Sequence, residues 1–221
     1  LPIRPEHMED QIYPVIYQKV KEELLSEKLL PTSKGKYAIA NDSLLARGKE
    51  LPEFLNENDI QKLFSKRNWL DTNITKDKTP ELRDYLINDL NVKEVDFKDF
   101  AETITVKFLQ IKSDRWMIDF YKRLLWQKEL WNDRYNQGIL RTKPIIRLET
   151  GEHIAPFNDR GEIQVYLPEE TKSRYRTVKR IFTKDKNSLK FFKELGIMEP
   201  SLFVEIKEYI LPKYQTNNHT K

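Results

Sequence analysis

The residues that could do acid–base chemistry are few. His153 stands near two carboxylates in sequence, Glu149 and Glu152, and a general base oriented by a carboxylate needs such a set. No nucleophile or electrophile stands beside it, and neighbouring residues of a strand, such as 152 and 153, point to opposite faces. We therefore interpret His153 as a strand histidine with a structural hydrogen bond.

Two short patterns could bind phosphate. Residues 31–36 (Pro-Thr-Ser-Lys-Gly-Lys) match part of a phosphate-binding loop, but the first glycine is missing and no helix is expected to follow. We interpret them as a hairpin turn. Thr-Lys-Asp-Lys occurs twice, at 75–78 and 183–186. A turn whose Thr or Asp caps the next helix, with solvated lysines, explains this repeat without a ligand.

Residues 172–190 carry the most one-sided charge, with eight basic residues against Asp185 alone. Basic residues interleaved with an aromatic ring can hold a nucleic-acid backbone or an acidic partner. The alternative is a solvated surface, or an internal partner for acidic residues such as Glu94, Asp96 and Asp99. The candidate contacts are Arg174, Tyr175, Arg176, Lys179, Arg180, Lys184 and Lys186.

Composition excludes several other classes of site. The 221 residues include no cysteine, three scattered histidines and six glycines, which rules out disulfide scaffolds, thiol nucleophiles and thiolate zinc sites. The net charge of +4 is smaller than a dedicated duplex-DNA binder usually carries. No apolar run is long enough to span a membrane. We expect a cytoplasmic chain that is not itself an enzyme and has no catalytic, cofactor-binding or metal-binding residue.

The apolar pattern predicts an α+β, mostly helical fold of two related units. Each unit is a small β-hairpin or sheet followed by helices. Two aliphatic residues precede a glycine at the same spacing in Leu29–Gly35 and Ile145–Gly151. Helices are predicted over 14–27, 52–66 (in two pieces), 79–88, 96–108, 113–136, 187–195 and 201–211, and strands over 29–31, 37–40, 144–148, 153–155 and 163–167.

These elements define the expected domain organisation. Residues 1–13 are a connector, 14–112 the first unit, 113–137 a bridging helix, 138–214 the second unit and 215–221 a frayed tail. The aromatic residues of the bridging helix, three tryptophans among them, are expected in the core rather than on a ligand platform. The connector-like start predicts a segment of a longer protein, and repeats of this size commonly belong to larger arrays.

Nearly the whole chain resembles one protein family. The residues that carry the resemblance are Leu29-Leu30-Pro31-Thr32, Gly35-Lys36-Tyr37, Ser43–Gly48, Trp69-Leu70, Thr79–Arg83, Lys143–Glu149, Gly151–Phe157 and Val165–Pro168. They resemble the region downstream of the ATPase domain in large bacterial sacsin-like proteins, whose ATPase is of the heat-shock-chaperone type in the GHKL superfamily. The superfamily's Asp-x-Gly-x-Gly motif is missing here.

The resemblance implies a non-catalytic middle module without a cofactor of its own, with ATP and Mg bound elsewhere in the full-length parent. Its partners would be other domains of the parent chain and client proteins, and its role interdomain transmission or docking. The basic stretch keeps an alternative open, a nucleic-acid-associated module of a bacterial defence or repair ATPase.

Overall fold

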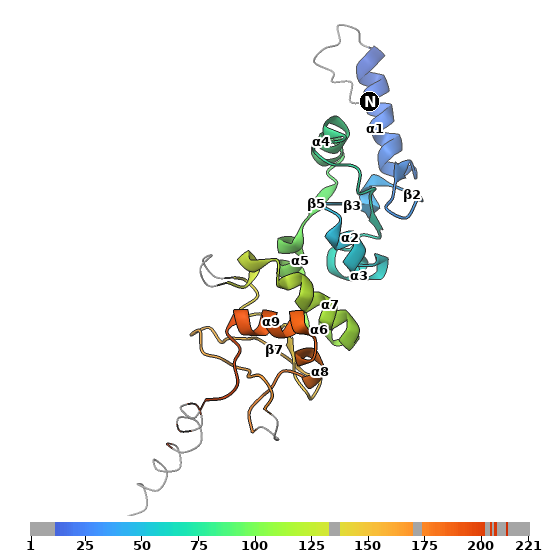
Figure 1. The fold of residues 1–221 in the computed structure, drawn as a ribbon. Helices are drawn as coiled ribbons and strands as arrows, with labels where there is room; N and C mark the ends of the chain where they lie inside the picture. Colours follow the sequence, from blue (N-terminus) through green and yellow to red (C-terminus); the bar gives the residue numbers. More distant parts are fainter. Residues whose placement is uncertain are drawn as a thin grey trace, which may run out of the picture. The chain divides into compact units, whose positions relative to one another are not determined.

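A computed structural model describes residues 12–132, 138–169 and 174–201, together with 204, 206 and 211 (Figure 1). The fold is α+β and mostly helical, as predicted, with small sheets. It forms two compact units, unit 1 (Leu1–Ile104) and unit 2 (Thr105–Lys221). Most of the predicted connector and of the helix over 201–211, and the whole predicted tail, lie outside the described residues.

Unit 1 is built around a parallel sheet of three short strands. Its elements are α1 (Ile12–Ser26), β1 (Leu30–Pro31), β2 (Tyr37–Ala38), the 3-10 helix η2 (Ala40–Asp42), β3 (Ser43–Ala46), α2 (Glu50–Phe54), α3 (Glu57–Phe64), β4 (Asn68–Trp69), α4 (Pro80–Asn88), β5 (Lys93–Val95) and α5 (Phe97–Thr103). The strands β1 and β2 form the predicted antiparallel hairpin. The sheet has the order β4-β3-β5, in which Leu44 lies opposite both Trp69 and Lys93. None of these three strands, the central β3 included, is among the strands predicted from the sequence.

Local side chains define the helix starts of unit 1. The Asn56 side chain accepts from the Asp59 amide in a capping box at α3, and Asp96 caps α5 in the same way. Pro80 occupies the first turn of α4, where its missing N–H costs nothing. The helix predicted from Asp96 to Phe108 is wrong in its length, because Thr105 caps a new helix, α6.

Unit 2 corrects two predictions. Its elements are α6 (Val106–Gln110), α7 (Asp114–Leu124), the 3-10 helix η3 (Lys128–Leu130), β6 (Ile146–Arg147), β7 (His153–Ile154), α8 (Arg180–Thr183) and α9 (Lys186–Leu195). The predicted bridging helix ends early, at Leu124, and α7 lies inside unit 2. The strand predicted over 163–167 is reduced to isolated bridges at Ile163 and Tyr166.

The predicted bridging helix stops where the chain folds back after Leu124. The buried face of α7 consists of Met117, Phe120, Tyr121 and Leu124, at spacings of three, one and three. Trp131 is also buried, but its indole Nε1 donates back to the Leu124 carbonyl at 2.6 Å. That bond requires the chain to fold back after α7, which a continuous helix would prevent. Ser113 caps α7 as predicted.

The two units repeat the same hairpin. In the first, the Thr32 amide donates to Lys36 at 2.8 Å, and in the second Leu148 donates to Glu152 at 2.8 Å. In both, the glycine of the turn has positive φ, +69° and +88°, and donates back to the residue that opens the turn at 3.0 Å. Glycine adopts this conformation at no steric cost. The predicted duplication therefore holds at the level of individual main-chain bonds.

The connection from hairpin to sheet repeats as well. Thr32 forms an antiparallel bridge with Leu70, and Leu148 forms the equivalent bridge with Val178. The next residues, Asp71 and Lys179, donate their amides to the first-strand residues, Pro31 at 2.9 Å and Arg147 at 3.1 Å. In unit 2, Tyr166 takes the place of the central strand, because Val178 donates to its carbonyl as Leu70 donates to that of Leu44.

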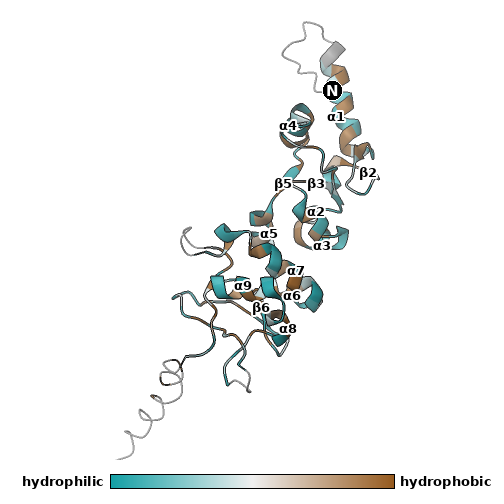
Figure 2. Ribbon diagram, in the orientation of Figure 1, coloured by the Kyte–Doolittle hydropathy of each residue, from teal (hydrophilic) through white to brown (hydrophobic). Residues whose placement is uncertain are grey.

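The core repeats with these bonds. Buried residues of unit 1 have buried counterparts at equivalent places of unit 2, namely Leu30 and Ile146, Leu45 and Leu167, Leu70 and Val178, Ile74 and Phe182, Leu86 and Phe192, Leu90 and Leu195, and Val92 and Ile197. The helix ends match too, with Asn91 and Gly196 both at positive φ. Apolar and hydrophilic residues alternate along α7 and α9, as amphipathic packing against this core requires (Figure 2).

Candidate functional site

A buried arginine organises the polar interior of unit 2. The Arg147 side chain is 7% exposed. Its Nη1 donates to the Asp114 carboxylate at 3.0 Å, and its Nη2 to the carbonyls of Leu109 and Lys112 at 2.7 and 2.8 Å. The Lys179 ammonium completes the Asp114 ion pair at 2.6 Å. Although burial alone would raise the pKa of Asp114, bonds from Lys179 and Arg147 hold it below its ordinary value.

His153 belongs to the same cluster. Arg147 Nε donates to His153 Nε2 at 3.0 Å, so the imidazole lone pair at Nε2 is engaged. Partial burial and the neighbouring guanidinium lower the pKa of His153 to about 4. A histidine that is neutral at pH 7 but has this lone pair occupied is poorly suited to take a proton from a substrate. The interpretation as a strand histidine with a structural hydrogen bond is confirmed.

A shallow cleft of about 270 Å³ lies beside this cluster. It is lined by Val106, Gln110, Leu148, Glu152, His153, Ile154 and Arg176. Glu152 and His153 are both among the lining residues. Its one cation, Arg176, and one carboxylate, Glu152, leave its lining without net charge.

The predicted basic segment divides into structural and exposed residues. Lys179 is half-buried against Asp114, and the Arg180 amide donates to Glu149 at 2.8 Å. Tyr175 packs against Tyr166, with ring centroids 5.2 Å apart. The side chains of Arg174, Arg176, Arg180, Lys184 and Lys186 are exposed. Lys172 lies outside the described residues. The segment thus contributes both packing contacts within unit 2 and exposed positive charges.

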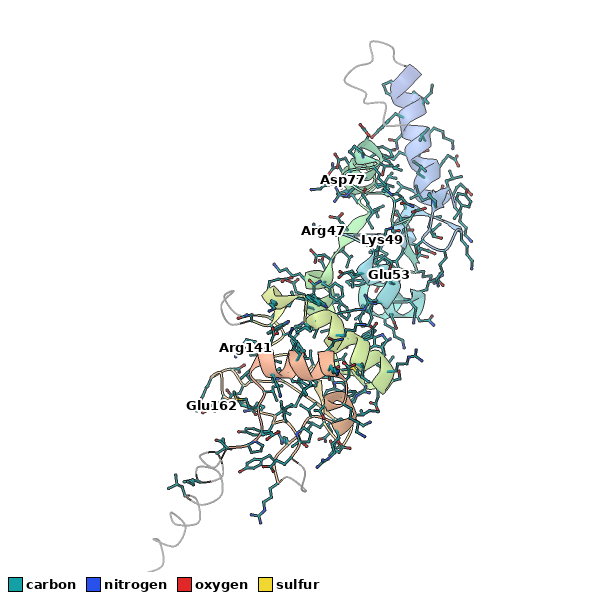
Figure 3. All side chains as sticks on the ribbon, in the orientation of Figure 1. Arg47, Lys49, Glu53, Asp77, Arg141 and Glu162 are labelled. Carbon is teal, nitrogen blue, oxygen red and sulfur yellow. The ribbon has the colours of Figure 1, made fainter. Side chains whose placement is uncertain are left out.

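The carboxylates suggested as internal partners pair within unit 1 instead. Glu94 accepts from Arg83 and from Arg47, which also reaches Asp96 at 3.1 Å (Arg47 is labelled in Figure 3). Asp99 lies 3.5 Å from the Lys93 ammonium. Burial opposes ionisation of Glu94, but its bonds from Arg83 and Arg47 lower its pKa below the ordinary value. These carboxylates hold β5 to α4 and to the end of β3.

The two phosphate-like patterns are turns, as interpreted. Residues 32–36 close the first hairpin, and Lys34 pairs with Glu57 at 3.2 Å. In the repeated Thr-Lys-Asp-Lys, Thr75 accepts from the Lys78 amide, whereas Asp185 caps α9 through the Ser188 amide. The motif therefore caps a helix in unit 2 only, because α4 begins after Thr79 without a side-chain cap, while Thr75 closes the turn before it.

Two features of unit 2 were missed. The aliphatic neighbours of Arg147 in Ile145-Ile146-Arg147-Leu148 already indicated a buried arginine. Of the three tryptophans of the predicted bridging helix, Trp131 is buried and Trp116 half-buried, but Trp126 is 75% exposed. Trp126 follows α7 and falls outside its apolar spacing, which was the available signal.

The two units differ in net charge. Unit 1 has 16 Lys and Arg against 20 Asp and Glu, a net −4, and unit 2 has 23 against 15, a net +8. The mild charge of the whole chain therefore conceals one acidic and one strongly basic unit. Within the described ranges, no group of His, Cys, Asp and Glu could hold a metal ion. No helix in that part of the chain is long and apolar enough to cross a membrane.

Comparison of the chain with protein-family models, curated proteins and solved structures finds no significant match.

Proposed function

We propose that this chain is a non-catalytic middle module of a larger sacsin-like, chaperone-type ATPase. It transmits changes between domains of the parent or docks partner and client proteins, and binds no nucleotide itself. The observation that supports this most is the repeated unit, in which hairpin, sheet and helix are joined by the same main-chain bonds. Repeated units of this size serve as structural modules in longer arrays.

The polar interior supports the same role. Two of the carboxylates with lowered pKa, Glu94 and Asp114, each bind two cationic side chains. Catalytic groups usually keep an open coordination or hydrogen-bonding position for substrate. Here Arg83, Arg147 and Lys179 take those positions and tie one element to another. These ion pairs therefore have a structural role inside each unit.

A titration tests the claim that the segment is nucleotide-free. The chain of 221 residues is titrated with Mg-ATP and Mg-ADP by calorimetry, at protein concentrations that detect dissociation constants up to about 1 mM. We expect no binding heat. Saturable binding in the micromolar range would refute the proposal, because the nucleotide site is then inside this segment.

A further inference from the structure

We propose that the C-terminal end of α7, the following η3 and the exposed face of α9 form a binding surface for single-stranded nucleic acid. Trp126 is its stacking platform, and lysines from η3 and α9 contact the phosphates. This activity is additional to the interdomain role and does not depend on it.

The indole of Trp126 is the first observation. It is 75% exposed, whereas Trp69 and Trp131 are buried and donate their Nε1–H groups to main-chain carbonyls. A side chain of this size normally stabilises the fold by burial. An exposed indole contributes little to folding, but its face can stack on an unpaired base, which proteins use to hold single strands.

The lysines of α9 are the second observation. Lys186, Lys190 and Lys193 recur at spacings of four and three residues, so they share one face of the helix. All three are exposed, while Ser188, Phe191, Phe192 and Leu195 are buried on the opposite face. The three lysines therefore form a positively charged stripe about 10 Å long on the exposed face of α9. A phosphodiester backbone can lie along this stripe.

An ion pair brings the indole segment next to this stripe. The Lys128 ammonium lies 2.9 Å from the Glu194 carboxylate, and Lys190 lies 3.8 Å from the same side chain. Trp126 is two residues before Lys128, and Lys122 is exposed in the last turn of α7. One carboxylate shared by two lysines leaves the surface positive.

Helix dipoles explain the cations only in part. Lys122 and Lys193 lie in last turns, where positive charge is favourable. Lys186 is the first residue of α9, where a positive charge opposes the dipole. The lysine at that position and the exposed indole have no such structural explanation, and both fit an anionic partner with aromatic bases.

The partner is single-stranded because an aromatic side chain stacks on bases that are not paired. About four phosphate contacts, from Lys128, Lys186, Lys190 and Lys193, give a slope of about −3 in the logarithm of affinity against that of salt concentration. The net +8 of unit 2 favours the encounter.

The test uses the chain of 221 residues and fluorescein-labelled oligomers of twelve deoxythymidines or twelve uridines. Anisotropy is followed between 50 and 200 mM salt for the wild type, Trp126→Ala, the triple variant K186A/K190A/K193A, and a control with three exposed lysines of unit 1 removed, K62A/K76A/K98A. We expect Trp126→Ala to weaken binding about tenfold without changing the salt slope. The triple variant should reduce the slope by about 2, and the control should match the wild type.

The competing outcomes are separated in the same experiment. Absence of binding by the wild type at 50 mM salt overturns the proposal, as does equal binding by all four proteins. Tighter binding of a twelve-base-pair duplex, of polyglutamate or of anionic vesicles would assign the surface to another partner and overturn it too. Circular dichroism of each variant establishes that the exposed substitutions leave the fold intact.

Discussion

Arg147 donates from Nε to His153 Nε2 at 3.0 Å, across the second hairpin. The two residues are directly opposite each other in the register of β6 and β7. Through the same guanidinium, Arg147 also binds the carbonyls that end α6 and precede α7. Pro31 occupies the equivalent position in unit 1. Because a proline side chain has no hydrogen-bond donor, it cannot link that hairpin to the helices as Arg147 does.

Removing this guanidinium should destabilise unit 2 strongly. We expect Arg147→Ala to lower the free energy of unfolding by about 3–5 kcal/mol, because Asp114 loses a buried partner and two carbonyls lose their donor. Arg147→Lys should recover part of the loss, since it keeps the charge but not the fork of donors. Urea denaturation measures both. A loss below 1 kcal/mol for the alanine variant would show that the network is not what holds the hairpin.

His153 should make the chain acid-sensitive above the range of the carboxylates. Its pKa in the folded state, about 4, lies below the ordinary 6.5, so the unfolded state binds the proton more readily. Stability from this group is complete above about pH 6.5 and is lost as the pH falls towards 4, by roughly 2–3 kcal/mol. In His153→Gln this component should be missing. Denaturation at several pH values checks it, and identical pH profiles for both proteins would contradict it.

Glu94 should make the stability of unit 1 depend on pH, in a more acidic range than His153 does in unit 2. Its pKa is lowered in the fold, so its contribution is present at neutral pH and is lost as the pH falls through the folded-state value. We expect Glu94→Gln to cost about 2 kcal/mol at pH 7, because the Arg83 guanidinium loses a charged partner, and to cost much less at pH 3. The matched control is Glu57→Gln, because Glu57 forms a more exposed ion pair with Lys34. An equal cost at both pH values would mean that the ion pair does not stabilise the unit.

The two turn glycines should be equivalent in energy. Gly35 and Gly151 have positive φ, and a Cβ at either position would meet no neighbouring atom. Alanine should therefore cost only the backbone strain, about 1–2 kcal/mol at each site. Thermal or urea denaturation of G35A and G151A measures this. A large cost at one site with none at the other would argue against a shared hairpin geometry.

Much of the fold could be predicted because its signals are local. Asn56, Asp96 and Ser113 cap helices through their own side chains and Pro80 occupies a first turn, so the residue types near each start indicated a helix there. The strand β3 was missed because it is buried on both faces and shows no alternation. The helix was overextended beyond Leu124, because the buried Leu130 and Trp131 continue its apolar pattern although the chain folds back and the Trp131 indole donates to the Leu124 carbonyl.

The site was harder to predict because charge in sequence does not indicate pairing in space. Lys179 has the same residue type as the exposed Lys184 but binds Asp114, which is 65 residues away. Arg174 and Arg176 remain at the surface, as the one-sided charge indicated. The separation into an acidic and a basic unit follows from the boundary at Ile104, which only the structure provides.

The proposed interdomain role is tested most directly by hydrogen exchange in the full-length parent that we propose, with and without the nucleotide expected to bind its ATPase domain. If this module transmits the change, protection of the main-chain amides that join hairpin to sheet, Asp71 and Lys179 among them, should differ between the two states. Unchanged exchange throughout both units, with nucleotide bound and turned over elsewhere in the parent, would contradict transmission through this module.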